Sequence, residues 1–124
     1  MGFSLRDRVR SFGYAGNGLR VLVSSQHNAR IHAVLTVLAI ALGFALGISG
    51  IEWCAIVLAI GLVWLAEGCN TALELLADAA VPEPSEKVGA AKDVAAGSVL
   101  VAAVAAALVG AIVFLPRLLA LVTA

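Results

Sequence analysis

Five polar side chains recur at helical spacing within a largely apolar sequence of 124 residues. Glu67, Asn70, Thr71, Glu74 and Asp78 stand at i, i+3, i+4, i+7 and i+11, which places them on one face of a helix. Carboxylates at membrane depth cost about 2.5–3.5 kcal/mol each, so a stripe of them indicates a cation, a proton or a functional partner. Oxygen ligands on one helix suit Mg²⁺, which takes one or two carboxylates and completes its shell with water and phosphate oxygens. We call these five residues the acidic stripe and predict a divalent-cation and phosphate site there.

Arginines near the N-terminus offer the acidic stripe a purely structural role. Arg6, Arg10 or Arg20 could pair with Glu67 and Glu74 and neutralise them. A passive ion pair accounts for one carboxylate better than for a whole stripe with an interleaved asparagine. The functional interpretation is therefore favoured.

Lys92 and Asp93 stand at the head of the last apolar stretch. The first turn of a helix presents free backbone N–H groups and the positive end of the dipole, so a lysine there helps to hold a phosphate. A snorkelling lysine beside an N-capping aspartate is the structural alternative. The sequence has no G-x-x-x-x-G-K-[ST] loop, so any nucleotide site must be built from helices.

A polar run over residues 26–32 comes directly before the first long apolar stretch. It includes Gln26, Arg30 and His32. The hydrated cap of a membrane helix accounts for this run as well as a binding role does. Its interest lies in its expected position on the same side of the membrane as the acidic stripe.

The elements that must position these residues are membrane helices. The chain is 62% apolar and only 13% charged, against roughly 25% charged residues in an average soluble domain. Three apolar stretches, residues 31–49, 51–77 and 94–115, are long enough to span a bilayer. The net charge is zero, so nucleic-acid binding is set aside. We predict an all-α membrane protein with a single domain over residues 1–124.

The charge distribution predicts the orientation of these spans. Five arginines lie in residues 1–30, and the loop expected over residues 78–93 carries two lysines. By the positive-inside rule both regions are cytoplasmic. At helical spacing, residues 3–24 place apolar side chains on one face and mostly basic side chains on the other, which predicts a helix lying in the membrane interface. Trp53 marks an interfacial turn between the first two spans, and Pro116 is expected to end the third.

Several motifs together resemble the bacterial integral-membrane diacylglycerol kinase and undecaprenol kinase family over nearly the whole chain. They are Arg10-Ser11-Phe12, Asn28-x-Arg30-Ile31-His32, Glu52-Trp53, Glu67-x-x-Asn70-Thr71-Ala72-x-Glu74-x-x-x-Asp78, Ala91-Lys92-Asp93 and Gly110-x-x-x-Phe114-Leu115-Pro116. The resemblance implies a homotrimer in the bacterial cytoplasmic (inner) membrane. Each subunit would have one surface helix and three transmembrane helices, with active sites at the cytoplasmic interface between subunits.

The same resemblance implies roles for individual residues. Glu67 matches the general base, Glu74 a Mg²⁺ ligand, and Asn70, Lys92 and Asp93 residues that hold ATP. Tyr14 and Glu83 also match nucleotide-contacting positions, and Arg30 and Trp53 lie in motifs expected to face lipid.

Two positions depart from the family pattern. Gln26 stands where the family usually has a glutamate metal ligand, and its neutral carbonyl oxygen is a weaker ligand. Asp7 stands where enterobacterial members have an arginine that approaches ATP. Arg6, Arg8 or Arg10 could supply this charge, and Arg10 is taken as the ATP-binding candidate.

The expected function is transfer of the γ-phosphate of ATP to the primary hydroxyl of undecaprenol or diacylglycerol. His32 and Asn70-Thr71 resemble the undecaprenol kinase branch, although apolar contacts discriminate lipid chains weakly. One alternative is a catalytically impaired member that binds lipid or assists assembly, since Gln26 replaces a ligand. The other is a small cation-coupled carrier, which would need polar groups across the whole membrane depth.

Overall fold

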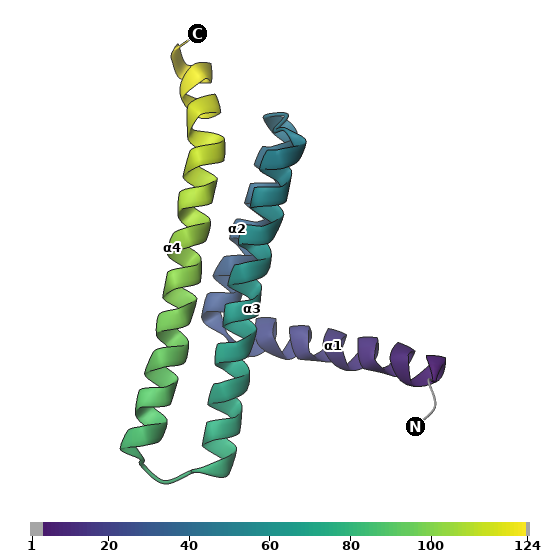
Figure 1. Cartoon of the computed structure of the whole chain (residues 1–124), viewed down its shortest axis with the longest axis vertical. Helices are drawn as coiled ribbons and strands as arrows, with labels where there is room; N and C mark the ends of the chain where they lie inside the picture. Colours follow the sequence, from purple (N-terminus) through teal and green to yellow (C-terminus); the bar gives the residue numbers. More distant parts are fainter. Residues whose placement is uncertain (1–3, 124) are drawn as a thin grey trace.

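The computed structural model describes residues 4–123, and this part of the chain contains four helices and no strand. They are α1 (Leu5–Ser25), α2 (His27–Ala45), α3 (Gly50–Ala80) and α4 (Glu86–Thr123). Three of them, α2, α3 and α4, are long and apolar enough to cross a membrane. These three run side by side, whereas α1 projects sideways from them (Figure 1). The predicted all-α class with three candidate membrane spans is confirmed.

A single extended residue separates α1 from α2. Ser4 caps the start of α1, where its side chain accepts a hydrogen bond from the backbone N–H of Asp7. The helix ends at Ser25, and the next residue, Gln26, turns the chain into α2 with a φ of −106° and a ψ of 122°. Within α1 only Leu22 is buried, so both faces of the helix are largely exposed in one copy. Phe3, the first apolar residue expected in this helix, lies outside the described residues.

The turn between α2 and α3 lies at residues 46–49, earlier than the interfacial turn expected around Trp53. Gly47 adopts a φ of 59°, a left-handed conformation that glycine reaches without steric cost. Ser49 and Glu52 then form a reciprocal capping box that starts α3. The predicted span over 31–49 therefore corresponds to His27–Ala45, because the polar residues 27–30 already form the first helical turn.

The connection between α3 and α4 occupies residues 81–85, much shorter than the loop expected over 78–93. Pro82 and Pro84 account for the break, since proline cannot continue a helix without losing a hydrogen bond. Residues 86–93 contain no such breaker apart from Gly89, so α4 starts at Glu86. The polar residues on both sides of the connection extend α3 and α4 beyond their apolar stretches.

The sequence predicted that the last helix ends at Pro116, but α4 continues through this proline to Thr123. Arg117 reaches back to the first turn of α3, where its Nη1 and Nη2 donate to Glu52 Oε1 and Oε2 at 2.6 and 2.8 Å. Nη1 also donates to the carbonyl of Val113 at 3.1 Å. This two-pronged ion pair ties the far ends of α3 and α4 together.

The largest cluster of buried apolar residues lies at the same end of the bundle as this ion pair. It contains Ile48, Ile56, Val113 and Phe114. Most other large apolar side chains are exposed in the single chain, as expected for a protein whose solvent is lipid. The opposite end, where α3 and α4 extend beyond their apolar stretches, carries the acidic stripe.

Candidate active site

The first four residues of the acidic stripe lie on a largely buried face of α3, whereas Asp78 is exposed. Only 2% of Glu67 and 4% of Thr71 is exposed, and Asn70 and Glu74 are half-buried. The Asn70 amide Nδ2 donates a hydrogen bond of 3.1 Å to Glu74 Oε1. This bond orients the amide one turn before Glu74, so two members of the stripe are fixed relative to each other.

Three buried oxygens of the stripe have no hydrogen-bond partner within residues 4–123: Glu67 Oε2, Asn70 Oδ1 and Thr71 Oγ1. A buried polar atom left without a partner costs about 1–3 kcal/mol, and a charged one costs more. Such a group is typical of a site that is completed by a ligand, a proton or another subunit. Arg6, Arg10 and Arg20 lie exposed on α1, which gives no support to the passive ion-pair interpretation of Glu67.

Lys92 of α4 meets the Asp78 end of the stripe. Its ammonium forms an ion pair with the carboxylate of Asp78, across the α3–α4 connection. The predicted phosphate-binding lysine and the predicted stripe are thus brought together. Asp93 is exposed beside it, and Glu83 is exposed in the connection.

Other predicted site residues lie apart from this cluster. Arg10 and Tyr14 are on the exposed surface of α1. Trp53 is fourteen residues before Glu67 on α3, about 21 Å along the helix axis. It contacts Gly43, where an added Cβ would lie 2.6 Å from Trp53 Cη2, and its ring centroid is 4.8 Å from that of Phe44.

Arg30 makes contacts that its sequence position did not suggest. Its Nε donates to the carbonyl of Val23 at 3.0 Å, and its Nη2 donates to the carbonyl of Ser24. These carbonyls belong to the last turn of α1, where helix carbonyls lack partners and a cation is favoured. Arg30 therefore pins the end of α1 to the start of α2, beside the half-buried Gln26.

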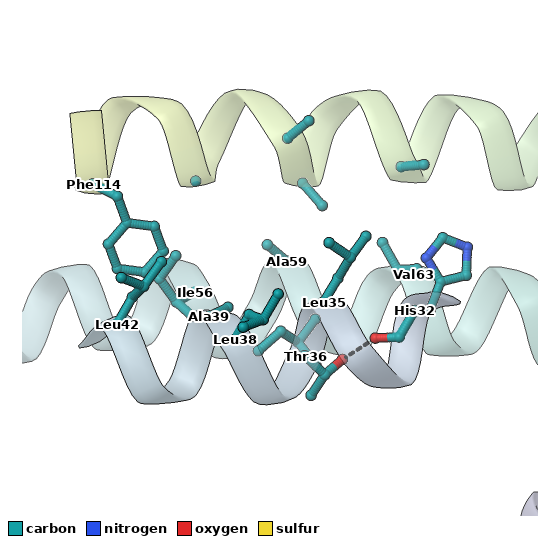
Figure 2. A pocket seen from close by; sticks show the side chains of 15 residues that line it. His32, Leu35, Thr36, Leu38, Ala39, Leu42, Ile56, Ala59, Val63 and Phe114 are labelled. Atoms are coloured by element: carbon teal, nitrogen blue, oxygen red, sulfur yellow. Dashed lines mark hydrogen bonds between the residues drawn. The ribbon is translucent and has the colours of Figure 1, made fainter. Parts of the chain in front are cut away.

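A half-open cavity of about 380 Å³ lies between α2, α3 and α4. It is lined by His32, Leu35, Thr36, Leu38, Ala39, Leu42, Ile56, Ala59, Ile60, Val63, Ala103, Ala106, Ala107, Gly110 and Phe114. His32 and Val63 lie at one end of it and Phe114 at the other (Figure 2). Val63 stands one helical turn before Glu67 on α3, so the cavity approaches the acidic stripe from the membrane side.

Comparison with known proteins identifies the family of this chain. Residues 13–114 match the profile of the family described as prokaryotic diacylglycerol kinase. The chain belongs to this family. It is 37% identical over 109 residues to the undecaprenol kinase of Bacillus subtilis, covering 88% of this chain and 89% of that protein. It is 39% identical over 112 residues to the diacylglycerol kinase of a Synechocystis species, covering 90% of this chain and 64% of that protein.

Membership of the prokaryotic diacylglycerol kinase family confirms the resemblance seen in the motifs. The chain is an ATP-dependent lipid kinase and a multi-pass membrane protein. The interpretation of the stripe as a small cation-coupled carrier is therefore wrong. Within the family match lie most of the predicted site residues, from Tyr14 to Asp93.

The kinase chemistry implies a metal ion, and the stripe fits one that is shared with phosphate. Glu67 and Glu74 are seven residues apart, about 10 Å along the helix, so their carboxylates do not bind one ion. Within the described residues no three His, Cys, Asp or Glu side chains are grouped to hold a metal. Mg²⁺ usually binds through one or two carboxylates plus substrate phosphates and water. Glu74, beside the unpartnered Asn70 Oδ1, offers that kind of partial ligand set.

The cavity is the feature that the sequence analysis missed. Small residues in membrane helices commonly permit close helix contact, but Ala103, Ala106, Ala107 and Gly110 of α4 line open space within one copy. The hydrogen bond from Trp64 Nε1 to Thr36 Oγ1, at 3.0 Å, was also not foreseen. Polar pairs inside apolar stretches leave no periodic signal, so only the packed structure shows which residues meet.

Proposed function

We propose that this kinase transfers the γ-phosphate of Mg·ATP to the primary hydroxyl of a membrane lipid alcohol, with Glu67 as the general base. The observation that supports this role is the Glu67 carboxylate itself, 2% exposed and with Oε2 unpartnered within residues 4–123. A carboxylate oxygen without a hydrogen-bond donor is free to accept a proton from an alcohol that reaches it. Glu67 is also the member of the stripe nearest the apolar part of α3.

The reaction follows from the chemistry of phosphoryl transfer. The lipid oxygen attacks the γ-phosphorus while its proton passes to the Glu67 carboxylate. The new O–P bond forms as the bond from the γ-phosphorus to the β,γ-bridging oxygen breaks, and ADP leaves. Positioning and charge neutralisation supply most of the catalysis in such transfers.

The cytoplasmic half of the stripe is assigned to the nucleotide. Glu74 and the carbonyl of Gln26 would hold Mg²⁺, which supplies neutralisation of phosphate charge when it is bound. Asn70, Lys92 and Asp93 bind ATP, and Glu83, Tyr14 and Arg10 contribute further contacts. Lys92 already lies at this end through its ion pair with Asp78, close to where phosphates would arrive from the cytoplasm.

The assembly assigned to this kinase is a homotrimer with active sites shared between subunits, in the bacterial inner membrane. The unpartnered stripe oxygens and the exposed apolar helix faces of the single chain support a site completed by another copy. The N-terminus is cytoplasmic and α1 lies on the membrane surface, with its arginines toward lipid phosphates. Arg30 shapes the lipid side of the site by holding α1, and Trp53 contacts lipid at the opposite face.

The deciding experiment is transfer of labelled γ-phosphate from ATP by purified protein in micelles. Undecaprenol, diacylglycerol and a lipid without a free hydroxyl serve as acceptors. Label should appear in at least one alcohol and should be absent from the control lipid. If the protein is folded and binds Mg·ATP but labels no alcohol, it is instead a catalytically impaired member of the family, the alternative suggested by Gln26.

A further inference from the structure

The side chain of His32 lines the cavity between α2, α3 and α4, and its imidazole is free to form a hydrogen bond with a ligand there. Of the fifteen lining residues only His32 and Thr36 have polar side chains. The Thr36 hydroxyl is already used: it donates to the His32 carbonyl at 2.7 Å and accepts from Trp64 Nε1. The imidazole of His32 has no hydrogen-bond partner among residues 4–123. The cavity is thus apolar along its length and polar at one end (Figure 2).

The Thr36–Trp64 hydrogen bond sets the depth of His32 relative to Glu67. It fixes residue 36 of α2 level with residue 64 of the antiparallel α3. One helical turn toward the cytoplasm leads to His32 on α2 and to the Glu67–Gly68 step on α3, since both helices rise 1.5 Å per residue. The polar end of the cavity and the proposed base therefore lie at the same level of the membrane.

The lining chemistry indicates what kind of lipid fits. An apolar pocket with one placed polar group selects a ligand that is apolar along its length and polar at one end. A polyprenol meets this condition, because its hydroxyl is its only polar group. A diacylglycerol adds two ester carbonyls near its hydroxyl, and burying those beside the apolar lining without donors is unfavourable.

We propose that His32 is a substrate-binding residue that selects a single-chain polyprenol, whose first isoprene units occupy this cavity. The inference rests on the proposed kinase function. The imidazole N–H donates to the alcohol oxygen, the alcohol hydrogen points toward Glu67 Oε2, and the second lone pair of the oxygen remains free for attack on phosphorus. His32 thereby positions the hydroxyl and takes no proton itself.

Substitution of His32 tests the hydrogen bond. His32→Phe keeps a planar ring without a donor and should raise the KM for undecaprenol about tenfold or more, with the KM for ATP unchanged. His32→Gln keeps an N–H donor and should recover most of that loss. The matched control is His27→Phe, which changes the exposed histidine five residues earlier and should leave both constants as in the wild type.

Filling the cavity tests its occupant. An added Cβ at Gly110 meets nothing within 4 Å, so Gly110→Leu can extend into the space without displacing backbone. It should lower kcat/KM for undecaprenol about tenfold while phosphorylation of the short isoprenol farnesol, supplied at saturation, changes little. Ala111→Leu adds the same side chain at the next, exposed position and should have no effect on either acceptor.

The outcomes separate this inference from the proposed function. If the wild type labels no lipid alcohol, the proposed function fails. If the wild type labels undecaprenol and His32→Phe has the same KM for it, the selective role of His32 is wrong. If Gly110→Leu loses activity equally toward undecaprenol, farnesol and diacylglycerol, the selective role of the cavity is wrong. A shift in oligomer size in Gly110→Leu would show that another copy fills the cavity, which also overturns the proposal.

Discussion

Glu67 holds a carboxylate at a depth where a charge is costly to keep, and its surroundings do not neutralise it. The side chain is 2% exposed, and Oε2 finds no hydrogen-bond donor in residues 4–123. A residue placed there for stability would be expected to have a partner. On the proposed function, its chemistry rather than its packing accounts for its presence.

Replacing this carboxylate by an amide separates proton transfer from binding. Glu67→Gln keeps the size of the side chain but removes the base, so kcat should fall below about a tenth of the wild-type value while Mg·ATP binding persists. Phosphate transfer and nucleotide binding are measured on the same preparation. Glu86→Gln, at the exposed start of α4, is the control. A variant that keeps more activity than this would remove Glu67 from the role of base.

Glu74 should respond to metal concentration where Glu67 does not. Glu74→Gln weakens the ligand set but leaves the base in place, so raised Mg²⁺ or added Mn²⁺ should restore part of the lost activity. The amide oxygen of the new side chain can still accept from Asn70 Nδ2, which keeps the local geometry. An unchanged metal dependence would argue against Glu74 as a ligand.

Gln26 gives the converse test by adding charge. A carboxylate at this half-buried position should attract Mg²⁺ more strongly than a neutral carbonyl, by on the order of 1 kcal/mol. Gln26→Glu is therefore expected to lower the Mg²⁺ concentration that gives half-maximal activity. Titration of Mg²⁺ at fixed Mg·ATP compares the two proteins. Superimposable curves would mean that Gln26 serves only as the break between α1 and α2.

At the scale of elements, the turn between α2 and α3 depends on one close contact. Trp53 lies against Gly43, and an added Cβ there would come within 2.6 Å of the indole. Gly43→Ala should consequently lower the free energy of unfolding by about 1–3 kcal/mol, as overpacking does.

Gly61→Ala is the matched control for that contact. Gly61 lies within α3 and has nothing within 4 Å of an added Cβ, so alanine should be neutral or stabilising by up to about 1 kcal/mol. Thermal unfolding of both variants in the same micelles measures the difference. Equal midpoints would mean that Trp53 moves aside freely, as a lipid-facing side chain would.

The far end of the bundle offers a prediction for α3 and α4 together. Arg117→Met removes both hydrogen bonds from Arg117 to Glu52 and leaves that carboxylate without its cation, so the Tm should fall by a few degrees. Adding Glu52→Gln to it should recover part of the loss, because no unpaired charge remains. Additive losses in the double variant would show that the two side chains act independently.

Helices were more predictable from the sequence than their ends and contacts. The apolar stretches gave α2, α3 and α4, because their length and hydropathy are properties of single segments. Residues 86–93 were assigned to a loop because they are polar, although polarity marks only the membrane boundary. The helix beyond Pro116 depends on Arg117 meeting Glu52, 65 positions earlier, a contact that no local pattern encodes. The acidic stripe was predictable because its spacing is a property of one segment. The lack of a partner for Glu67 and the cavity beside His32 depend on how several helices pack, so the sequence did not reveal them.

At the scale of the whole molecule, a single copy leaves apolar surface exposed and polar atoms of the proposed site without partners in the described residues. Its three long helices leave most large apolar side chains exposed, and its proposed site retains unpartnered oxygens in the described residues. Lipid would cover the exposed apolar faces, and the proposed homotrimer would complete the site. On the proposed function, the soluble substrate reaches the site at the α3–α4 connection and the lipid substrate reaches it from the bilayer.

The junction at Gln26 restrains the angle between α1 and α2. One residue joins the two helices, and Arg30 donates hydrogen bonds across the junction to the Val23 and Ser24 carbonyls at the end of α1. α1 is 21 residues long, about 31 Å. If α1 lies on the membrane surface, as proposed, the position of that surface would affect how deep His32 lies in the bilayer. On the proposed mechanism, membrane thickness and surface charge would then influence the level at which the lipid hydroxyl meets Glu67.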